Sequence, residues 1–88
     1  MNIIFEQRFA KELQKLRDEK LLAKIKAIII ECKDAESLTE IRNLKKLRGY
    51  DTFYRIRAGD YRIGIECVGD ECIFTCILHR KDIYKNFP

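Results

Sequence analysis

The chain has 88 residues, of which 47% are hydrophobic and 36% charged, and it carries a net charge of +4. This size predicts a single domain over residues 1–88 with a small core, so we expect a function on an open surface rather than in a deep pocket. The composition excludes a disordered chain, and the lack of a long apolar run or a signal peptide predicts a cytoplasmic protein without a membrane partner.

The first part of the sequence predicts one strand and two helices. Residues 2–5 are rich in Ile and Phe, which favours a short strand. Between residues 6 and 17, Phe9, Leu13 and Leu16 recur at helical spacing. Asp18 is placed to cap a second amphipathic helix over residues 19–33. Because the connection between them is short, we expect an antiparallel helical hairpin.

The second part predicts a meander. Residues 37–40 follow a capping-box pattern, and residues 45–49 read as a basic connector. Apolar residues then alternate over residues 53–58, 61–68 and 72–79, and each connection carries a Gly-Asp turn. The fold is therefore predicted as α+β: an N-terminal strand, the helical hairpin and a three-stranded antiparallel meander, with the helices on one face of the sheet. Residues 80–88 are expected to form a flexible tail.

The first Gly-Asp turn predicts a cluster of arginines. If Gly59-Asp60 is the loop, Arg57 lies opposite Arg62 and Arg55 opposite Gly64, so the three arginines share one face around a gap at the glycine. Opposed like charges are destabilising, and guanidinium groups match phosphate oxygens, so this face is suited to a phosphate or a string of carboxylates. The alternative is a solvated face on which the arginines pair with nearby acids, namely Asp51, Asp60, Glu66 or Asp70.

The register of the last strand is left open by the sequence. A two-residue Gly69-Asp70 loop places Thr75 and His79 on the arginine face, whereas a longer or bulged connection brings Arg80 there instead. His79 is able to exchange protons at physiological pH, but a lone histidine at the end of a strand is more often structural than catalytic.

The four cysteines are interpreted as reduced, apolar core residues. The spacing Cys67-x4-Cys72-x3-Cys76 contains no CxxC pair and His79 is the only histidine, so a zinc site is the weaker alternative. We expect no metal and no other cofactor.

Three runs of sequence together resemble the RelE branch of the RelE/ParE toxin superfamily. They are Leu-Arg-Gly within residues 44–50, Tyr-Arg-x-Arg and Gly-Asp-Tyr-Arg within residues 53–64, and His-Arg-Lys-Asp-Ile-Tyr at residues 79–84. The resemblance covers essentially the whole chain. It implies a type II toxin that a cognate RelB-like antitoxin neutralises and that contacts operator DNA only through that antitoxin.

The resemblance also implies an activity and a site. Such a toxin enters the ribosomal A site and cleaves mRNA without a metal, by attack of the ribose 2′-hydroxyl on the adjacent phosphate. By motif position, the catalytic residues are Arg55, Arg57, Arg62, Arg80 and Tyr84. Further contacts to RNA are expected from Lys45, Lys46, Arg48, His79, Lys81 and Lys85.

The implied roles follow from charge and ring chemistry. The arginines of the two strands hold the scissile phosphate, Arg80 supports the leaving group or the RNA backbone, and Tyr84 stacks on a base or helps to move a proton. The paired basic positions 55 and 57 depart from well-studied members, which have lysine there. Because arginine cannot act as a general base, either Tyr84 or His79 serves, or positioning and charge supply most of the rate.

Two other functions remain open at this stage. One is a ParE-like poison of DNA gyrase, and the other is a catalytically weak toxin that acts only as an antitoxin-binding module. For the antitoxin itself we expect an amphipathic helix that docks on exposed apolar and basic surface, including the helix over residues 19–33.

Overall fold

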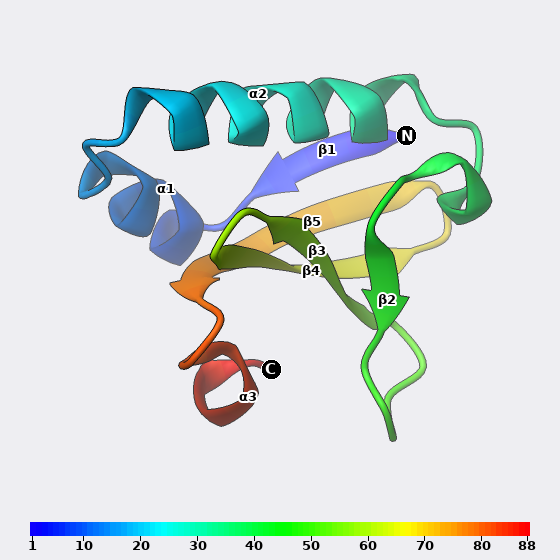
Figure 1. The fold of residues 1–88 in the computed structure, drawn as a ribbon. Coiled ribbons are helices and arrows are strands. Elements are labelled where there is room, and N and C mark those ends of the chain that lie inside the picture. Colours follow the sequence, from blue (N-terminus) through cyan, green and yellow to red (C-terminus); the bar gives the residue numbers. More distant parts are fainter.

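The computed structural model describes residues 1–88 and contains one five-stranded sheet with the strand order β1-β5-β4-β3-β2 (Figure 1). Its strands are β1 (Asn2–Phe5), β2 (Leu44–Lys46), β3 (Phe53–Ala58), β4 (Tyr61–Val68) and β5 (Glu71–His79). The helices are α1 (Gln7–Gln14), α2 (Glu19–Asp34) and α3 (Ile83–Asn86), with a 3-10 turn η1 (Leu38–Glu40). The predicted α+β architecture is confirmed, and β1 and β5 pair in parallel at one side of the sheet.

The edge strand β2 corrects the expectation of a basic connector at residues 45–49. Leu44, Lys45 and Lys46 pair with Ile56, Arg55 and Tyr54 of β3. Three residues with two lysines are too short to produce a recognisable alternation, so the sequence pattern gave no signal for this strand. Lysines on an edge strand also discourage further strands from pairing there.

Local hydrogen bonds determine where the helices begin and end. Asp18 caps α2 as predicted, because its Oδ1 accepts from Lys20 N at 3.0 Å and from Leu21 N at 3.1 Å. The first helix ends at Gln14 rather than at the predicted residue 17, and its last turn tightens as Lys15 N donates to Glu12 O. The capping box at residues 37–40 does not form, since the Ser37 hydroxyl lies 2.8 Å from the Thr39 hydroxyl instead.

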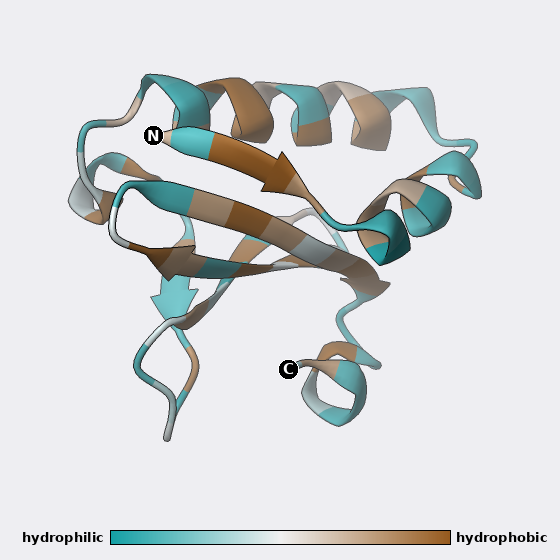
Figure 2. Cartoon of the chain, turned by 180° about the vertical axis from the view of Figure 1, so that it is seen from behind, coloured by the Kyte–Doolittle hydropathy of each residue, from teal (hydrophilic) through white to brown (hydrophobic).

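The main core lies between the sheet and the helices α1 and α2, which both cover the same face (Figure 2). The helix α1 packs mainly against β5, and α2 contacts β1 and β3. The buried centre includes Phe9 of α1, Ile25 of α2 and the strand residues Ile56, Ile63 and Ile65, as the alternation predicts. No helix in the structure combines the length and the apolar character that a membrane span requires.

The C-terminal segment covers part of the opposite face of the sheet and is not the flexible tail that was expected. Figure 1 shows α3 on the side away from α1 and α2. Ile83 and Phe87 are buried against Cys76 in a second, smaller core. The partly buried side chains packed around it are Leu47, Phe53 and Leu78. This docking places α3 beside the arginine-bearing strands.

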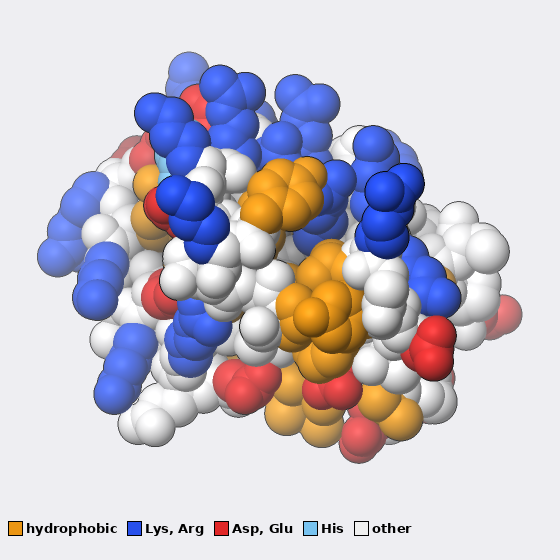
Figure 3. Space-filling view, turned by 90° about the horizontal axis from the view of Figure 1, so that it is seen from below, with side chains coloured by type: hydrophobic (Ala, Val, Ile, Leu, Met, Phe, Trp, Pro, Cys, Tyr) orange, Lys and Arg blue, Asp and Glu red, His pale blue; other side chains and the backbone are white.

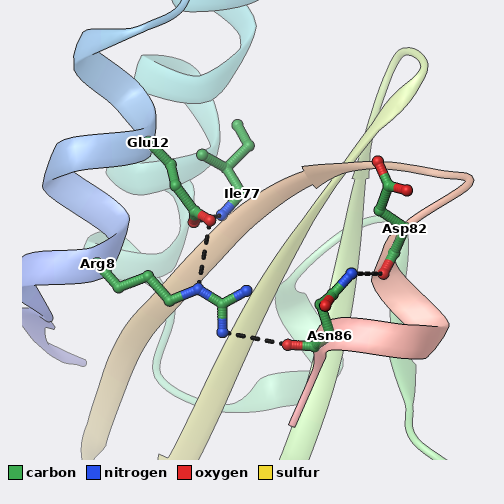
Figure 4. A network of polar contacts seen from close by, with 5 residues as sticks. All are labelled: Arg8, Glu12, Ile77, Asp82 and Asn86. Atoms are coloured by element: carbon green, nitrogen blue, oxygen red, sulfur yellow. Dashed lines mark hydrogen bonds and ion pairs between the residues drawn. The ribbon is translucent and has the colours of Figure 1, made fainter.

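A polar network joins α1 to β5 and α3 (Figure 4). Glu12 Oε1 accepts from the backbone N of Ile77 at 3.0 Å, beyond the end of the β1–β5 pairing. Glu12 Oε2 accepts from Arg8 Nε at 3.3 Å, and Arg8 Nη1 donates to the carbonyl of Asn86 at 3.1 Å. Within the C-terminal segment, Asn86 Nδ2 donates to the carbonyl of Asp82 at 3.0 Å. The position of α3 is thus coupled to α1.

Candidate functional site

The predicted arginine register is confirmed. Ala58 pairs with Tyr61, Arg57 with Arg62 and Arg55 with Gly64, and Gly59 has a φ of 61°, as the first position of the predicted turn requires. Because alternate residues share a face, the three arginines project together from the side of the sheet that α1 and α2 leave uncovered.

These side chains line a cavity of about 200 Å³, here called the arginine cavity. It is built from four different elements: β3, β4, the edge strand β2 and the C-terminal helix α3. Its lining residues are Asn43, Lys45, Arg55, Arg57, Arg62 and Tyr84. Figure 3 shows basic side chains gathered on this face beside a hydrophobic cluster. The strand β2 and the docked helix α3, both missed from the sequence, therefore complete the site.

Tyr84 is held at the rim of the cavity by Arg55. The Arg55 guanidinium donates from Nη1 to the Tyr84 hydroxyl, and its Cζ lies 4.7 Å from the centre of the ring. Tyr84 is nevertheless 72% exposed, so most of the ring is available to another molecule. A cation against an aromatic ring is attracted to the ring electrons, which helps to orient both groups.

Arg62 lies close enough to the other arginines of this face to feel their positive charges. Its Nη1 donates to the carbonyls of Gly59 at 2.8 Å and of Tyr61 at 2.9 Å. Burial lowers the pKa of Arg62, and the charges of Arg57, Arg55 and Arg80 lower it further. A bound anion would reduce the repulsion among these cations, so the cavity favours the binding of an anion.

The alternative in which nearby acids neutralise this face is wrong. The ion pairs of the chain are Arg8–Glu12, Arg42–Glu31 and Lys46–Asp51. None of them involves an arginine of the cavity or Arg80. The charge of this face is therefore available to an external ligand.

Gly64 does not leave a gap among the arginines, contrary to the expectation. A Cβ atom at this position would lie 2.9 Å from Phe87 Cδ1 and 2.8 Å from Cys76 Sγ. The glycine therefore gives room to the C-terminal segment, not to a ligand. This role of Gly64 could not be predicted from the sequence, because the sequence does not indicate where Phe87 packs.

A bulge in β5 decides between the two registers of the last strand. The turn Gly69-Asp70 has two residues, but Gly64 pairs with Cys76 and Ile65 with Phe74, which leaves Thr75 unpaired. Beyond the bulge, alternation turns Arg80 toward the arginines, where its charge acts on Arg62. The bulged alternative is thus the correct one.

His79 consequently lies outside the cavity. It pairs with Tyr61, whose ring meets the imidazole edge to face at 5.5 Å. Its Nδ1 accepts from the backbone N of Lys81 at 3.2 Å. Both contacts are those of a residue that terminates a strand.

The other predicted RNA contacts differ in how close they lie to the cavity. Lys45 lines it. Lys46 pairs with Asp51 at 3.9 Å, and Arg48 is exposed in the loop between β2 and β3. Lys81 and Lys85 are exposed on the C-terminal segment. These four side chains do not line the cavity.

Asn43 is the lining residue that the sequence analysis missed. It has a φ of 60° and its carbonyl accepts from Arg57 N at 3.2 Å, so it positions the backbone of that arginine. Asparagine tolerates the left-handed conformation better than most residues. The only signal in the sequence was the position of Asn43 just before a basic run. That position does not distinguish a residue of the site from a residue of an ordinary turn.

The three cysteines considered for zinc do not converge. Cys67 and Cys72 belong to the main core under the helices, whereas Cys76 packs with Ile83 and Phe87 on the other face of the sheet. All the cysteines, including Cys32 on α2, are buried and free.

Similarity to known proteins decides the family. Residues 3–84 match the family of the ParE toxin of the type II toxin–antitoxin system parDE. The curated toxin RelE3 of Methanocaldococcus jannaschii is 45% identical over 89 residues, which cover 100% of both chains. The chain belongs to the RelE/ParE superfamily of type II toxins. The resemblance of its three sequence runs to this superfamily is therefore confirmed.

Solved structures of RelE/ParE toxins have the same fold. The RelB-RelE antitoxin-toxin complex from Methanococcus jannaschii contains a chain that is 44% identical, with a TM-score of 0.80 over 97% of this chain and 99% of that one. A RelE-RelB complex from Pyrococcus horikoshii OT3 gives a TM-score of 0.73 at 19% identity, over 90% and 93% of the two chains. At this lower identity the likeness concerns the fold alone.

Proposed function

We propose that this RelE/ParE toxin is a metal-independent endoribonuclease that cleaves mRNA in the ribosomal A site. One observation carries the proposal: Arg55, Arg57 and Arg62 line one cavity with Lys45 and Tyr84, and no carboxylate of the chain neutralises them. Guanidinium groups are suited to phosphate oxygens, and an exposed aromatic ring to an unstacked base. Action on ribosomes would take place in the cytoplasm.

The chemistry requires stabilisation of the negative charge that develops on the phosphate oxygens. Attack by the 2′-oxygen on the adjacent phosphate increases the negative charge on the phosphate oxygens before the 5′-oxygen leaves. Arg57 and Arg62, paired across the strands, would hold those oxygens, and Arg80 would stabilise the leaving side. The products are a 2′,3′-cyclic phosphate and a free 5′-hydroxyl. Arginine remains protonated throughout, so these residues act by charge and position.

Proton transfer must come from other groups. His79 lies outside the cavity, so the hydroxyl of Tyr84 and the amine of Lys45 are the lining side chains that could exchange a proton. Even without a strong base, charge stabilisation and positioning by the toxin would lower the barrier.

A RelB-like antitoxin is the partner that we propose for this toxin. The similar toxin from Methanococcus jannaschii was solved as a RelB-RelE complex. Acidic side chains of such an antitoxin would neutralise the unpaired arginines, and its amphipathic helix would cover apolar surface that includes α2. Contact with operator DNA would then be indirect, through the antitoxin.

The second candidate is a poison of DNA gyrase, and the family match to ParE toxins favours it. Gyrase poisoning depends on contacts between proteins and does not need a cavity lined by arginines. The arginine cavity therefore favours the ribonuclease over the gyrase poison. A catalytically weak toxin is the third candidate, because arginine replaces lysine at positions 55 and 57.

The test is in-vitro translation with primer-extension mapping of the mRNA. Wild-type toxin should cut within the A-site codon, while Arg62→Ala and the double variant Arg55→Ala with Arg57→Ala should lose activity by about 100-fold or more, the cost of removing a transition-state donor. Arg17→Ala is the matched control, since Arg17 is an exposed arginine that donates to Gln14 O outside the cavity. Intact mRNA at full toxin dose would contradict the proposal, and a gyrase supercoiling assay would then test the second candidate.

A further inference from the structure

Two of the four buried cysteines face each other across a hairpin. Cys67 of β4 and Cys72 of β5 are direct partners in the register, and their sulfur atoms lie 3.0 Å apart. They are the pair next to Val68–Glu71, which flanks the two-residue turn Gly69-Asp70. Neither cysteine takes part in the proposed chemistry, because both belong to the core on the other side of the sheet.

The position of the pair in the hairpin suits a cross-strand disulfide. The pair that flanks a two-residue turn is hydrogen-bonded, so the next pair is not, and its Cα atoms approach to about 4.5 Å. Consistent with this, the N–H of Cys67 points away from β5 and donates to Thr52 O at 2.9 Å. A disulfide needs Cα atoms about 4.4–6.8 Å apart, so the strands hold both residues within the required range without rearrangement.

We propose that Cys67 and Cys72 are a modification site that a low-molecular-weight disulfide oxidises to a cross-strand disulfide. In the first step the thiolate of one cysteine attacks the oxidant, forming a mixed disulfide and releasing one thiolate. The second cysteine then loses its proton, attacks the protein sulfur of the mixed disulfide and releases the second thiolate. The protein loses two electrons and two protons, and the oxidant is reduced to two thiols.

In the proposed sequence of steps, Cys72 attacks first. The hydrogen bond from Cys67 lowers the pKa of Cys72, and the Met1 ammonium acts in the same direction. Burial raises the pKa of Cys32 to about 12 and that of Cys76 to about 11, so these two thiols form little thiolate. Reaction at Cys72 still requires the hairpin end to open, and this end includes Val68, which is 50% exposed.

The disulfide would act on stability rather than on the arginine cavity. The cysteine pair lies where β4 and β5 meet the chain start, since Met1 Sδ is 3.6 Å from Cys72 Sγ and the Met1 ammonium donates to Lys33 O at 2.8 Å. A cross-link here would hold the hairpin end closed and restrict the unfolded chain. We expect the thermal midpoint to rise by roughly 5–10 °C, reversibly on reduction.

The experiment exposes the folded, reduced protein to oxidised glutathione, blocks free thiols by alkylation after acid quenching and denaturation, and maps the peptides by mass spectrometry. The expected product has lost the mass of two hydrogens, carries one Cys67–Cys72 bond and is alkylated at the other two cysteines. The matched variants Cys32→Ser and Cys76→Ser should form the same bond, whereas Cys67→Ser and Cys72→Ser should not.

Some outcomes would overturn the proposal. One is complete alkylation of all four thiols after prolonged exposure to excess oxidant, and another is a bond that joins any other pair. Circular dichroism shows whether each variant is folded. If Cys67→Ser fails to fold, peptide mapping of the wild type still decides, because the proposal names the bonded pair.

Discussion

Tyr84 contributes a ring and a hydroxyl to the arginine cavity, and the two contributions can be separated. Its exposed ring lies against Arg55, and its hydroxyl accepts a hydrogen bond from the same guanidinium. We expect Tyr84→Ala to lower mRNA cleavage by about 10–100-fold, the range for loss of one base-stacking side chain. Tyr84→Phe keeps the ring and should lose less than about 10-fold.

Single-turnover cleavage of mRNA on stalled ribosomes measures both variants. Equal losses for phenylalanine and alanine would contradict the stacking role, and would assign the essential contribution to the hydroxyl.

Gly64 determines how closely Phe87 can approach the sheet. A methyl group there would meet Phe87 Cδ1 at 2.9 Å and Cys76 Sγ at 2.8 Å, so Gly64→Ala must displace the C-terminal segment. We expect it to lower the free energy of unfolding by about 1–3 kcal/mol, the usual cost of overpacking, and to reduce cleavage because Tyr84 moves with α3.

A double-mutant cycle with Phe87→Ala checks the cause by urea unfolding. Gly64→Ala should cost clearly less in the Phe87→Ala background, since the obstructing ring is gone. Additive costs would show that Phe87 is not the residue that the methyl group displaces.

At the residue scale, the arginines were predictable and their neighbours were not. A two-residue turn with glycine first sets the pairing of Arg57 with Arg62, and the period of two then sets their common face. The place of Arg80 depends on a bulge at Thr75, which the sequence does not mark with a glycine. The identity of the residue that fills the space above Gly64 depends on tertiary docking alone.

Among the secondary-structure elements, α1 supports the site from a distance. Glu12 accepts from the backbone of Ile77 in β5 and from Arg8, which in turn donates to the end of α3. We expect Glu12→Ala to lower the free energy of unfolding by about 1–3 kcal/mol, because it leaves the N–H of the buried Ile77 without an acceptor. The partly exposed ion pair with Arg8 itself contributes little.

Urea unfolding of Glu12→Gln provides the comparison, since glutamine keeps a carbonyl oxygen for Ile77 N. This variant should be less destabilised than Glu12→Ala. If both variants unfold at the same urea concentration, the hydrogen bond to β5 is not the source of the effect.

The elements that sequence analysis placed well are those with strong local signals. The helix α2 starts at its predicted cap Asp18, and β3 and β4 have the predicted bounds because their alternation is regular. The strand β2 and the helix α3 have three and four residues, too few for a periodic signal, and both form by packing on the rest of the fold. The arginine cavity depends on both, which is why it could be predicted only in part.

In the whole molecule, the two faces of one sheet have different roles, since one holds the core and the other the arginine cavity. One face is closed by α1 and α2 and holds the core, including the cysteine pair. The other face carries unpaired positive charge next to a small apolar cluster that anchors α3. In the proposed mechanism, this second face promotes attack by a ribose 2′-hydroxyl on the adjacent phosphate.

The decisive experiment uses a programmed ribosome that carries an mRNA with a single 2′-deoxy nucleotide at the cut position. The unmodified mRNA should be cut to a product that ends in a 2′,3′-cyclic phosphate. The 2′-deoxy mRNA should stay intact at that position although the toxin still binds the ribosome, because the attacking oxygen is missing. Cleavage of the 2′-deoxy position at an undiminished rate would rule out attack by the 2′-hydroxyl.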